Sequence, residues 1–122
     1  MRKYRVYIAG KLNDVAVNYI KNCHIMLEEA EKIRKEGFSV YVPCLNFLMG
    51  LYAGNYKYKD YFENSQPWLE VSDALYVCKN WKKSEGAKKE IEKAKEFRIP
   101  IFYDLESLIK WREQELRKKR NK

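Results

Sequence analysis

Residues 81–90 hold the side chains of this sequence that are best suited to chemistry. Ser84 is a good N-cap residue for the helix predicted to follow, and Gly86 lets the backbone approach a ligand closely. Free N–H groups at a helix start can bind phosphate. The Ser84 hydroxyl could therefore cap the helix or contact a ligand, and both interpretations stay open.

Glu90 lies one turn into that helix, at the edge of its apolar stripe. Ala87, Ile91 and Ala94 form the stripe at the three- and four-residue spacing of one helix face, and Arg98 continues it. A carboxylate on the helix side that faces a sheet needs either a charged or hydrogen-bonding partner or a functional role. Glu90 is accordingly either a structural carboxylate paired with a Lys or Arg, or a catalytic group.

Strand patterns alternate with helix patterns along the chain. Strands are predicted at 4–10, 38–43, 74–78 and 99–103, and helices at 14–36, 58–71, 85–97 and 105–120. Helix 58–71 is expected to be kinked or restarted at Pro67. Residues 44–56 follow no period, and their many apolar side chains suggest a lid or an oligomer contact.

This alternation predicts one α/β domain over residues 1–122. The expected fold is a doubly wound, flavodoxin- or Rossmann-like three-layer sandwich with four or five mainly parallel strands. In such folds, ligands bind beyond the carboxyl ends of the strands, near the point where the strand order reverses. That rule selects the loops after Gly10, Pro43 and Cys78, and the last of these leads into Trp81.

The bulk composition, 46% hydrophobic and 34% charged residues, is typical of a globular protein rather than a disordered one. The longest apolar runs are far shorter than the ~20 residues that span a bilayer, so no membrane association is expected. The N-terminal Met1–Tyr4 passes directly into a strand pattern, without a secretory signal.

Cys23, Cys44 and Cys78 are odd in number and lack CxxC spacing, which favours free thiols in a reducing cytoplasm. Cys23 and His24 make a poor zinc pair because adjacent helix positions point ~100° apart. No metal or other cofactor is expected. A packed side chain is the simplest interpretation of His24, and a single histidine gives little support to a Ser-His-Asp or Cys-His mechanism.

The formal net charge of +8 is concentrated in the C-terminal segment. Residues 110–122 contain seven basic and two acidic side chains. The segment is either a solvated terminal helix or an attractor of phosphate groups. Trp111 is the one aromatic residue of this segment, and no repeated aromatic-basic interleaving of the kind that stacks bases is present, which argues against nucleic acid as a partner.

Three segments, in order along the chain, carry a resemblance to a known family. They are Val6–Gly10 at the first strand, Trp68 and Leu69 with Ser72, Asp73 and Ala74 before the third strand, and Ser84, Gly86, Ala87, Glu90 and Ala94 at the helix start. Together they resemble the nucleoside 2-deoxyribosyltransferase-like superfamily, which includes the 2′-deoxynucleoside 5′-phosphate N-hydrolases. The resemblance covers about residues 4–103.

The resemblance implies a doubly wound fold in which Glu90 is the nucleophile on C1′ of a (deoxy)ribosyl group. The base departs, a covalent glycosyl-enzyme forms, and water or a second base completes the reaction. By the same analogy, Tyr7 hydrogen-bonds near the nucleophile and no cofactor takes part. The expected substrate-binding residues are Gly10, Lys11, Ser65, Trp81, Ser84 and Gly86. Members of this superfamily commonly form homodimers, so a homodimer or a higher homo-oligomer is expected.

The sequence departs from the family pattern at two positions. Ser65 stands where these enzymes usually carry a second acid, and a serine cannot protonate the leaving base; Asp60, Glu63 or Asn64 could substitute if the helix is shifted. Lys11 replaces the small residue or proline expected after Gly10.

Three functions follow from these observations. The first is an N-glycosidase or glycosyltransferase acting on a (deoxy)nucleoside or nucleoside 5′-monophosphate, with lysines 82, 83 and 88 favouring a phosphorylated substrate. The second, suggested by Ser65, is a module of the same fold that binds a nucleotide without cleaving it. The third and weakest is a nucleic-acid-binding domain that uses the basic tail.

Overall fold

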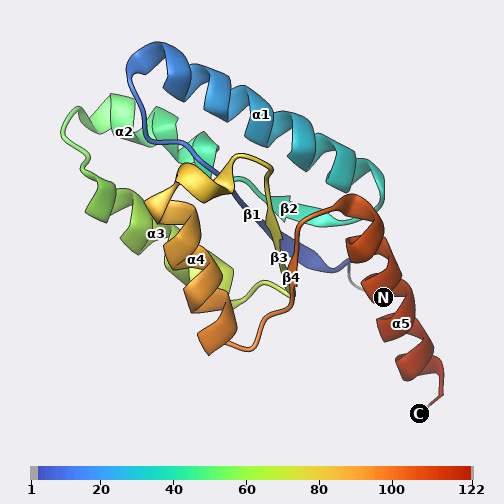
Figure 1. Cartoon of the computed structure of the whole chain (residues 1–122). Coiled ribbons are helices and arrows are strands. Elements are labelled where there is room, and N and C mark those ends of the chain that lie inside the picture. The colour runs from blue at the N-terminus through green and yellow to red at the C-terminus, as the bar shows by residue number, and fades with distance from the viewer. Residues whose placement is uncertain (1–2, 122) are drawn as a thin grey trace.

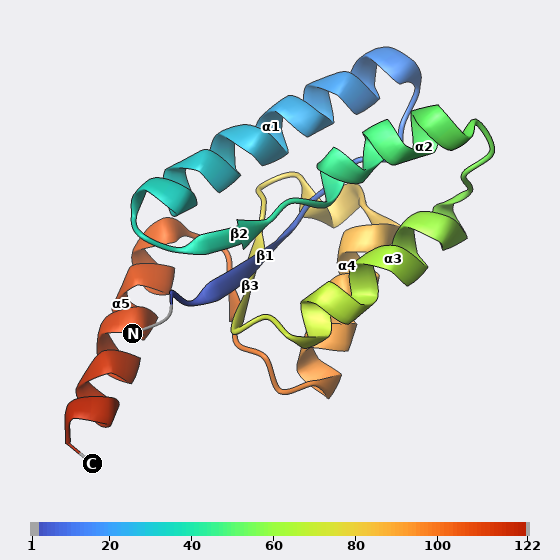
Figure 2. The same ribbon diagram turned by 180° about the vertical axis from the view of Figure 1, so that it is seen from behind.

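The computed structural model describes residues 3–121 and is built on one four-stranded parallel sheet (Figures 1 and 2). The strands are β1 (Arg5–Ala9), β2 (Ser39–Tyr41), β3 (Ala74–Val77) and β4 (Ile101–Phe102), in the spatial order β2-β1-β3-β4. The predicted α/β doubly wound fold is confirmed. The predictions that concern Met1, Arg2 and Lys122 lie outside the described residues.

Helices cover both faces of the sheet. On one face, α1 (Ala16–Lys35) and α5 (Leu105–Arg120) pack against inward residues of β1 and β3; this core includes Val6, Ile8, Met26, Ile33 and Leu108. On the other face, α3 (Tyr58–Glu70) and α4 (Glu85–Glu96) pack against the alternate residues of the same strands; that core includes Tyr7, Leu69, Leu75, Ile91 and Ala94. The alternation of side chains along a strand explains why β1 contributes to both cores.

Helix α1 ends where the sequence predicts. Gly37 follows its last turn with a φ of 97°, a left-handed conformation that glycine adopts without a steric penalty. His24, in the middle of α1, is exposed and lies 3.8 Å from a Glu28 carboxylate oxygen, so the expectation of a packed histidine was wrong. The side chain points to solvent because His24 lies on the face of α1 opposite the sheet, whereas Met26 in the same turn is buried.

The segment between β2 and α3 is more regular than its sequence pattern suggested. It forms the 3₁₀ turn η1 (Pro43–Asn46) and the short helix α2 (Phe47–Ala53), which ends at Gly54 with a φ of 77°. Five residues of this segment expose large apolar side chains, namely Leu45, Leu48, Met49, Leu51 and Tyr52. Their lack of helical period reflects the small part of α2 that is buried.

Helix α3 runs through Pro67 as one element to Glu70, so the alternative of a restart at that residue was wrong. Proline removes one N–H donor, but the backbone remains helical to Glu70. Asp60 bonds to the Lys57 backbone N–H at 2.7 Å, and Glu63 lies 3.6 Å from Lys59 Nζ. Both carboxylates are therefore engaged at the outer surface of the helix.

The strand order reverses between β1 and β3, since β2 adds to one side of β1 and β3 to the other. The register pairs Tyr7 with Leu75 and Ala9 with Val77, so the carboxyl ends of both strands lie at the same edge of the sheet. The loops that follow them lead to Lys11 and, through the 3₁₀ turn η2 (Trp81–Lys83), to the start of α4. This edge is the topological switch point at which doubly wound folds bind ligands.

Candidate active site

A cavity of about 600 Å³ opens at the switch point. Its walls come from the loop after β1, from α1, from the segment between β2 and α3, from α3 itself, and from η2 and the first turns of α4. The lining residues are Gly10, Lys11, Leu12, Asn13, Tyr19, Met26, Pro43, Phe47, Tyr56, Tyr58, Tyr61, Phe62, Ser65, Lys83, Ser84, Glu85, Gly86, Lys89 and Glu90. Aromatic rings supply much of the wall, and hydroxyl and carboxylate groups supply its polar atoms.

Glu90 and Tyr7 form the central contact of the site. Glu90 is half-buried, and its Oε2 accepts a short hydrogen bond from the Tyr7 hydroxyl, which is buried beneath the cavity. Burial raises the pKa of Glu90 to about 7, and the hydrogen bond from Tyr7 offsets part of that rise. Among residues 3–121, no Lys or Arg forms an ion pair with Glu90; its partner is a neutral phenol.

Helix phase explains why Glu90 faces this cavity. Ala87, Ile91 and Ala94 are buried against the sheet, and Glu92 and Glu96 are exposed on the opposite side of α4. Glu90 lies at the boundary between these two faces, one turn after the helix start. The predicted phase of α4 is confirmed, whereas Arg98 follows the end of the helix with a φ of 59°.

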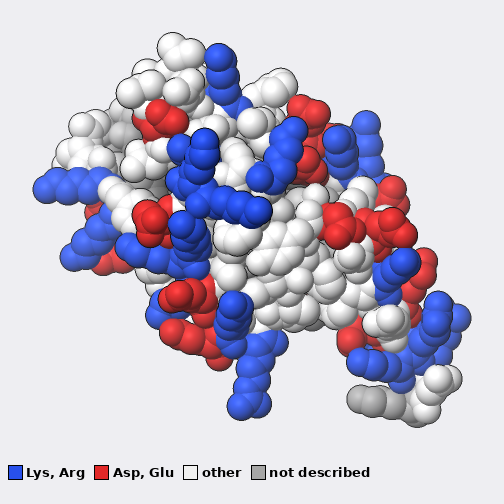
Figure 3. All heavy atoms as spheres, viewed as in Figure 1, with Lys and Arg blue, Asp and Glu red and all other residues white. Residues whose placement is uncertain are grey.

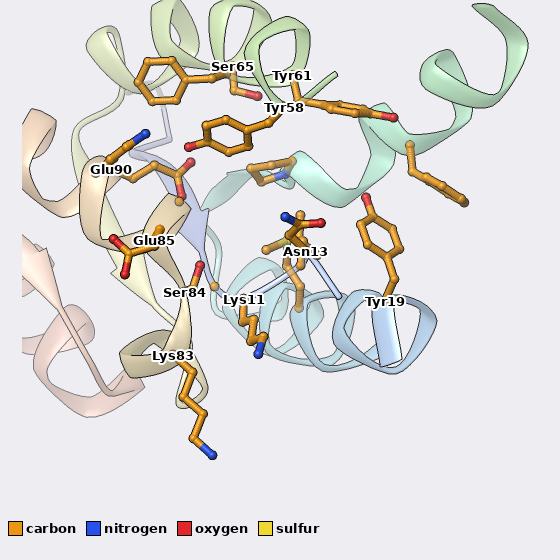
Figure 4. Close-up of a pocket in the computed structure, with 18 of the residues that line it drawn as sticks. Lys11, Asn13, Tyr19, Tyr58, Tyr61, Ser65, Lys83, Ser84, Glu85 and Glu90 are labelled. Carbon is orange, nitrogen blue, oxygen red and sulfur yellow. The ribbon is translucent and has the colours of Figure 1, made fainter. Parts of the chain in front are cut away.

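Ser84 caps α4 and lines the cavity at the same time. Its Oγ accepts a hydrogen bond from the Ala87 N–H at 3.0 Å, and its side chain is buried. The cap fixes the first turn of the helix that carries Glu90. Figure 4 shows the Ser84 hydroxyl and the Glu90 carboxylate on the same side of the helix start.

Ser65 lies under the cavity as part of a hydrogen-bonded chain. Asn46 Nδ2 donates to Ser65 Oγ at 3.2 Å and to the Tyr41 hydroxyl at 3.0 Å. Burial and the neighbouring Glu90 raise the pKa of Tyr7 well above its usual range, and a hydrogen bond from Ser65 offsets part of that rise. Asn46 was not predicted from the sequence; its position at the end of η1, in the connection that follows β2, was the available signal.

Tyr58 is the second hydroxyl directed at Glu90 (Figure 4). Burial raises its pKa, and the negative charge of Glu90 raises it further. The Tyr58 ring also carries a cation on its face, since Lys89 Nζ lies 5.1 Å from the ring centroid. The sequence pattern marked Tyr58 only as the first residue of a predicted helix, and no local signal pointed its hydroxyl toward Glu90.

The other predicted site residues divide into two groups. Gly10, Lys11 and Gly86 line the cavity, with the Lys11 backbone N–H held by Asn80 Oδ1 at 3.1 Å. A Cβ on Gly10 would lie 3.0 Å from Cys78 Cβ, so a glycine is needed where the two loops meet. Trp81 does not line the cavity; its ring packs on Tyr103 with a centroid distance of 5.6 Å.

Basic side chains surround the opening. In Figure 3, Lys and Arg gather over η2 and the first turns of α4, the elements that contain Lys82, Lys83 and Lys88. Lys83 lines the cavity but extends away from Glu90 in Figure 4. Lys11 also lines the cavity, and its Nζ lies 3.5 Å from an Asp14 carboxylate oxygen.

Among residues 3–121, no cluster of three or more His, Cys, Asp or Glu side chains could hold a metal ion. Cys23, Cys44 and Cys78 are free thiols in the structure. Within the same residues, no helix is both long and apolar enough to cross a membrane.

The family model described as a domain of unknown function, DUF4406, matches residues 4–103. The chain belongs to this family. The matched range contains all four strands and every residue that lines the cavity, and it ends before α5. No curated protein matches the chain.

Proposed function

We propose that this DUF4406 member cleaves the N-glycosidic bond of a (deoxy)nucleoside or nucleoside 5′-monophosphate, with Glu90 as the nucleophile. The observation that carries the proposal is the Glu90 carboxylate, half-buried in a cavity of about 600 Å³ and held by the Tyr7 hydroxyl instead of a cation. A carboxylate that is not held in a structural ion pair can attack C1′. The resemblance to the nucleoside 2-deoxyribosyltransferase-like superfamily assigns the same role to Glu90.

The shape and charge of the cavity fit such a substrate. Rings of Tyr19, Tyr58 and Tyr61 offer flat surfaces for a base, and the Gly10 and Ser84 loops lie where a ribose would contact Glu90. Lysines at the opening favour a 5′-phosphate. Water or a second base would then release the sugar from Glu90.

The test is base release from a panel of nucleosides and their 5′-monophosphates, followed by chromatography. Glu90→Gln keeps the shape of the side chain and should lower release by on the order of 10³-fold or more. Glu92→Gln, on the exposed side of the same helix, is the matched control and should retain activity. Release that is the same in Glu90→Gln and in the unmodified protein would exclude Glu90 as the nucleophile.

A second function, nucleotide binding without cleavage, is favoured by Ser65. Its hydroxyl occupies the inner wall of the cavity and bonds to Tyr7, so the position offers a hydrogen bond but no carboxyl group. Thermal stabilisation by a nucleotide, with no base released over hours, would support this function over catalysis.

We also propose that the protein self-associates through the apolar surface of residues 45–52 and is cytoplasmic. Tyr52 is 95% exposed and Leu48 is 68% exposed, an unusual concentration of apolar area for one short segment. The free thiols fit a reducing compartment. Light scattering of the unmodified protein and of Leu48→Glu tests the association; a monomer in both cases would contradict it.

A further inference from the structure

Three hydrogen bonds beneath the cavity, from Asn46 to Ser65, from Ser65 to Tyr7 and from Tyr7 to Glu90, form a chain that runs toward Glu90. The single proton of the Tyr7 hydroxyl is donated to Glu90 Oε2, so the Tyr7 oxygen can only accept from Ser65. Ser65 Oγ in turn accepts from Asn46 Nδ2 at 3.2 Å and gives its own proton to Tyr7. This donor chain stabilises the negative charge on Glu90.

The donor chain has a chemical consequence. Each proton in it is already committed to the next oxygen, so neither Ser65 nor Tyr7 holds a proton that it can deliver to a departing base. The donor chain keeps Glu90 charged for the attack on C1′, but it supplies no proton to the leaving group.

The remaining acids and cations of the cavity lie near its opening. Glu85 is exposed, and its carboxylate oxygen lies 3.7 Å from Lys88 Nζ, so it is an ion-paired acceptor. Lys89 is held on the Tyr58 ring and Lys11 beside Asp14. Tyr58 points at Glu90, and its raised pKa makes its phenol a weaker acid than an ordinary tyrosine. Burial also raises the pKa of the Tyr19 and Tyr61 phenols on the cavity wall, so the acids in the described part of the cavity are poorly suited to protonate a departing base.

A neutral purine or pyrimidine needs a proton as it leaves, and a general acid typically contributes 10²–10⁴-fold to the rate. A base that is already a cation leaves as a neutral molecule and needs none. We propose that the substrate of this site is an N-glycoside with a cationic heteroaromatic leaving group, a pyridinium or N7-alkylpurinium nucleoside or its 5′-phosphate. The inference rests on the proposed function and specifies its substrate class.

The aromatic wall suits a cationic ring. Faces of Tyr and Phe rings attract cations, and Lys89 Nζ, 5.1 Å from the Tyr58 centroid, already shows this attraction at the cavity wall. Tyr61 and Phe62 follow Tyr58 along α3 and line the same cavity. A cationic base would thus lie against the rings and near Glu90, with its phosphate toward the lysines at the opening.

The reaction balances without an acid. A Glu90 carboxylate oxygen forms a bond to C1′ as the C1′–N bond breaks, and the bonding electron pair neutralises the charge on the ring nitrogen. Water then attacks C1′ and returns the Glu90 carboxylate. The products are a free sugar, a neutral base and one proton, which passes to solvent.

The test compares two substrates that differ by one methyl group and one charge, guanosine and 7-methylguanosine. Assays are run below neutral pH, where the methylated base keeps its positive charge. The expected result is a kcat/KM higher by about 10²–10⁴-fold for 7-methylguanosine, with release from both lost in Glu90→Gln. A nicotinamide nucleoside and its 5′-phosphate form the pyridinium arm. Release of nicotinamide alone would show a pyridinium substrate, and release of both nicotinamide and 7-methylguanine would show that the site accepts either class of cationic base. Both results support the inference.

The pH profile and one variant complete the test. For the nicotinamide substrate, the rate should rise with pH through one ionisation and then stay level, because no acid has to keep a proton. Tyr58→Phe should lower release of the cationic and neutral bases by the same factor. Three results would overturn the inference but not the proposed function. They are Glu90-dependent release of guanine at a comparable rate, a fall of the nicotinamide-release rate at alkaline pH, and a selective loss of guanine release in Tyr58→Phe. No Glu90-dependent release from any substrate overturns both.

Discussion

Oε2 of Glu90 accepts a hydrogen bond from the hydroxyl of Tyr7, although the two residues are 83 positions apart and belong to α4 and β1. The sheet and the helix that covers it are therefore joined at the point where the chemistry is proposed. Burial raises the Glu90 pKa to about 7 and the hydrogen bond from Tyr7 offsets part of that rise, so both determine how the site responds to pH.

The rate of base release should increase with pH through about 7, because the nucleophile must be ionised. Tyr7→Phe removes the hydrogen bond that lowers the Glu90 pKa, so the midpoint should move to higher pH and the rate below it should fall about tenfold or more. Tyr103→Phe, which alters a tyrosine outside the cavity, is the control and should leave the midpoint unchanged. An unshifted midpoint in Tyr7→Phe would show that another group governs the profile.

Glu90 should also make folding stability depend on pH. Its pKa is raised on folding from an ordinary 4.5 to about 7, so the folded state binds the proton more tightly. Stability linked to Glu90 is fully present below about 4.5 and is lost as pH rises to about 7. Glu90→Gln avoids this loss and should stabilise the protein above neutral pH by about 1–3 kcal/mol, since partial contact with water limits the effect.

This stability prediction is measured by denaturant unfolding at several pH values. Glu92→Gln, exposed on the same helix, should change stability little at any pH. An equal gain for Glu90→Gln at acidic and alkaline pH would contradict the linkage.

The two helix caps provide a matched pair of variants. Ser84 Oγ accepts from Ala87 N at 3.0 Å, and Asp104 Oδ1 accepts from Ser107 N at 2.8 Å. Ser84→Ala and Asp104→Ala should each cost about 1 kcal/mol in thermal or chemical unfolding. Only Ser84→Ala should also reduce base release, since α4 carries Glu90. Equal effects of both variants on activity would argue against a site at the start of α4.

Gly50 makes room for Tyr61, a tyrosine of the cavity wall. A Cβ at Gly50 would overlap the Tyr61 hydroxyl and lie 2.7 Å from Cζ of the same ring. Gly50→Ala should therefore destabilise the protein by about 1–3 kcal/mol. In a Tyr61→Ala background the same change should be neutral or stabilising by up to about 1 kcal/mol, because alanine favours a helix. Additive effects in this double-mutant cycle would contradict the contact.

The fold was predictable because its strands and helices have clear periods. The continuous apolar run at Ala74–Val77 predicts a buried strand, and it is the most buried strand of the sheet. The sequence pattern did not predict a helix within residues 44–56. Helix α2 has seven residues and one buried position, Gly50, so its sequence shows no apolar stripe. Helix α3 does not restart at Pro67 because a single lost hydrogen bond did not outweigh the packing of α3 on the sheet.

Part of the site was also accessible from the sequence. The spacing of apolar residues in the helix predicted that Glu90 faces the sheet. The rule that ligands bind where the strand order reverses predicted the loops around it. The family resemblance implied a hydrogen bond from Tyr7 near Glu90, whereas the position of Asn46 and the direction of Tyr58 depend on contacts between distant segments. No local pattern encodes such contacts, so they required the structure.

The most direct test of the account is to trap the sugar on the protein. A 2′-fluorinated arabinosyl nucleoside slows the second step of a retaining mechanism, so a glycosyl-enzyme should accumulate after the base has left. Acid quenching, peptic digestion and peptide fragmentation then locate the added mass. The account predicts one glycosyl group on Glu90, absent from Glu90→Gln and present in Glu92→Gln. Base release with the sugar on another residue, such as Glu85, would contradict it.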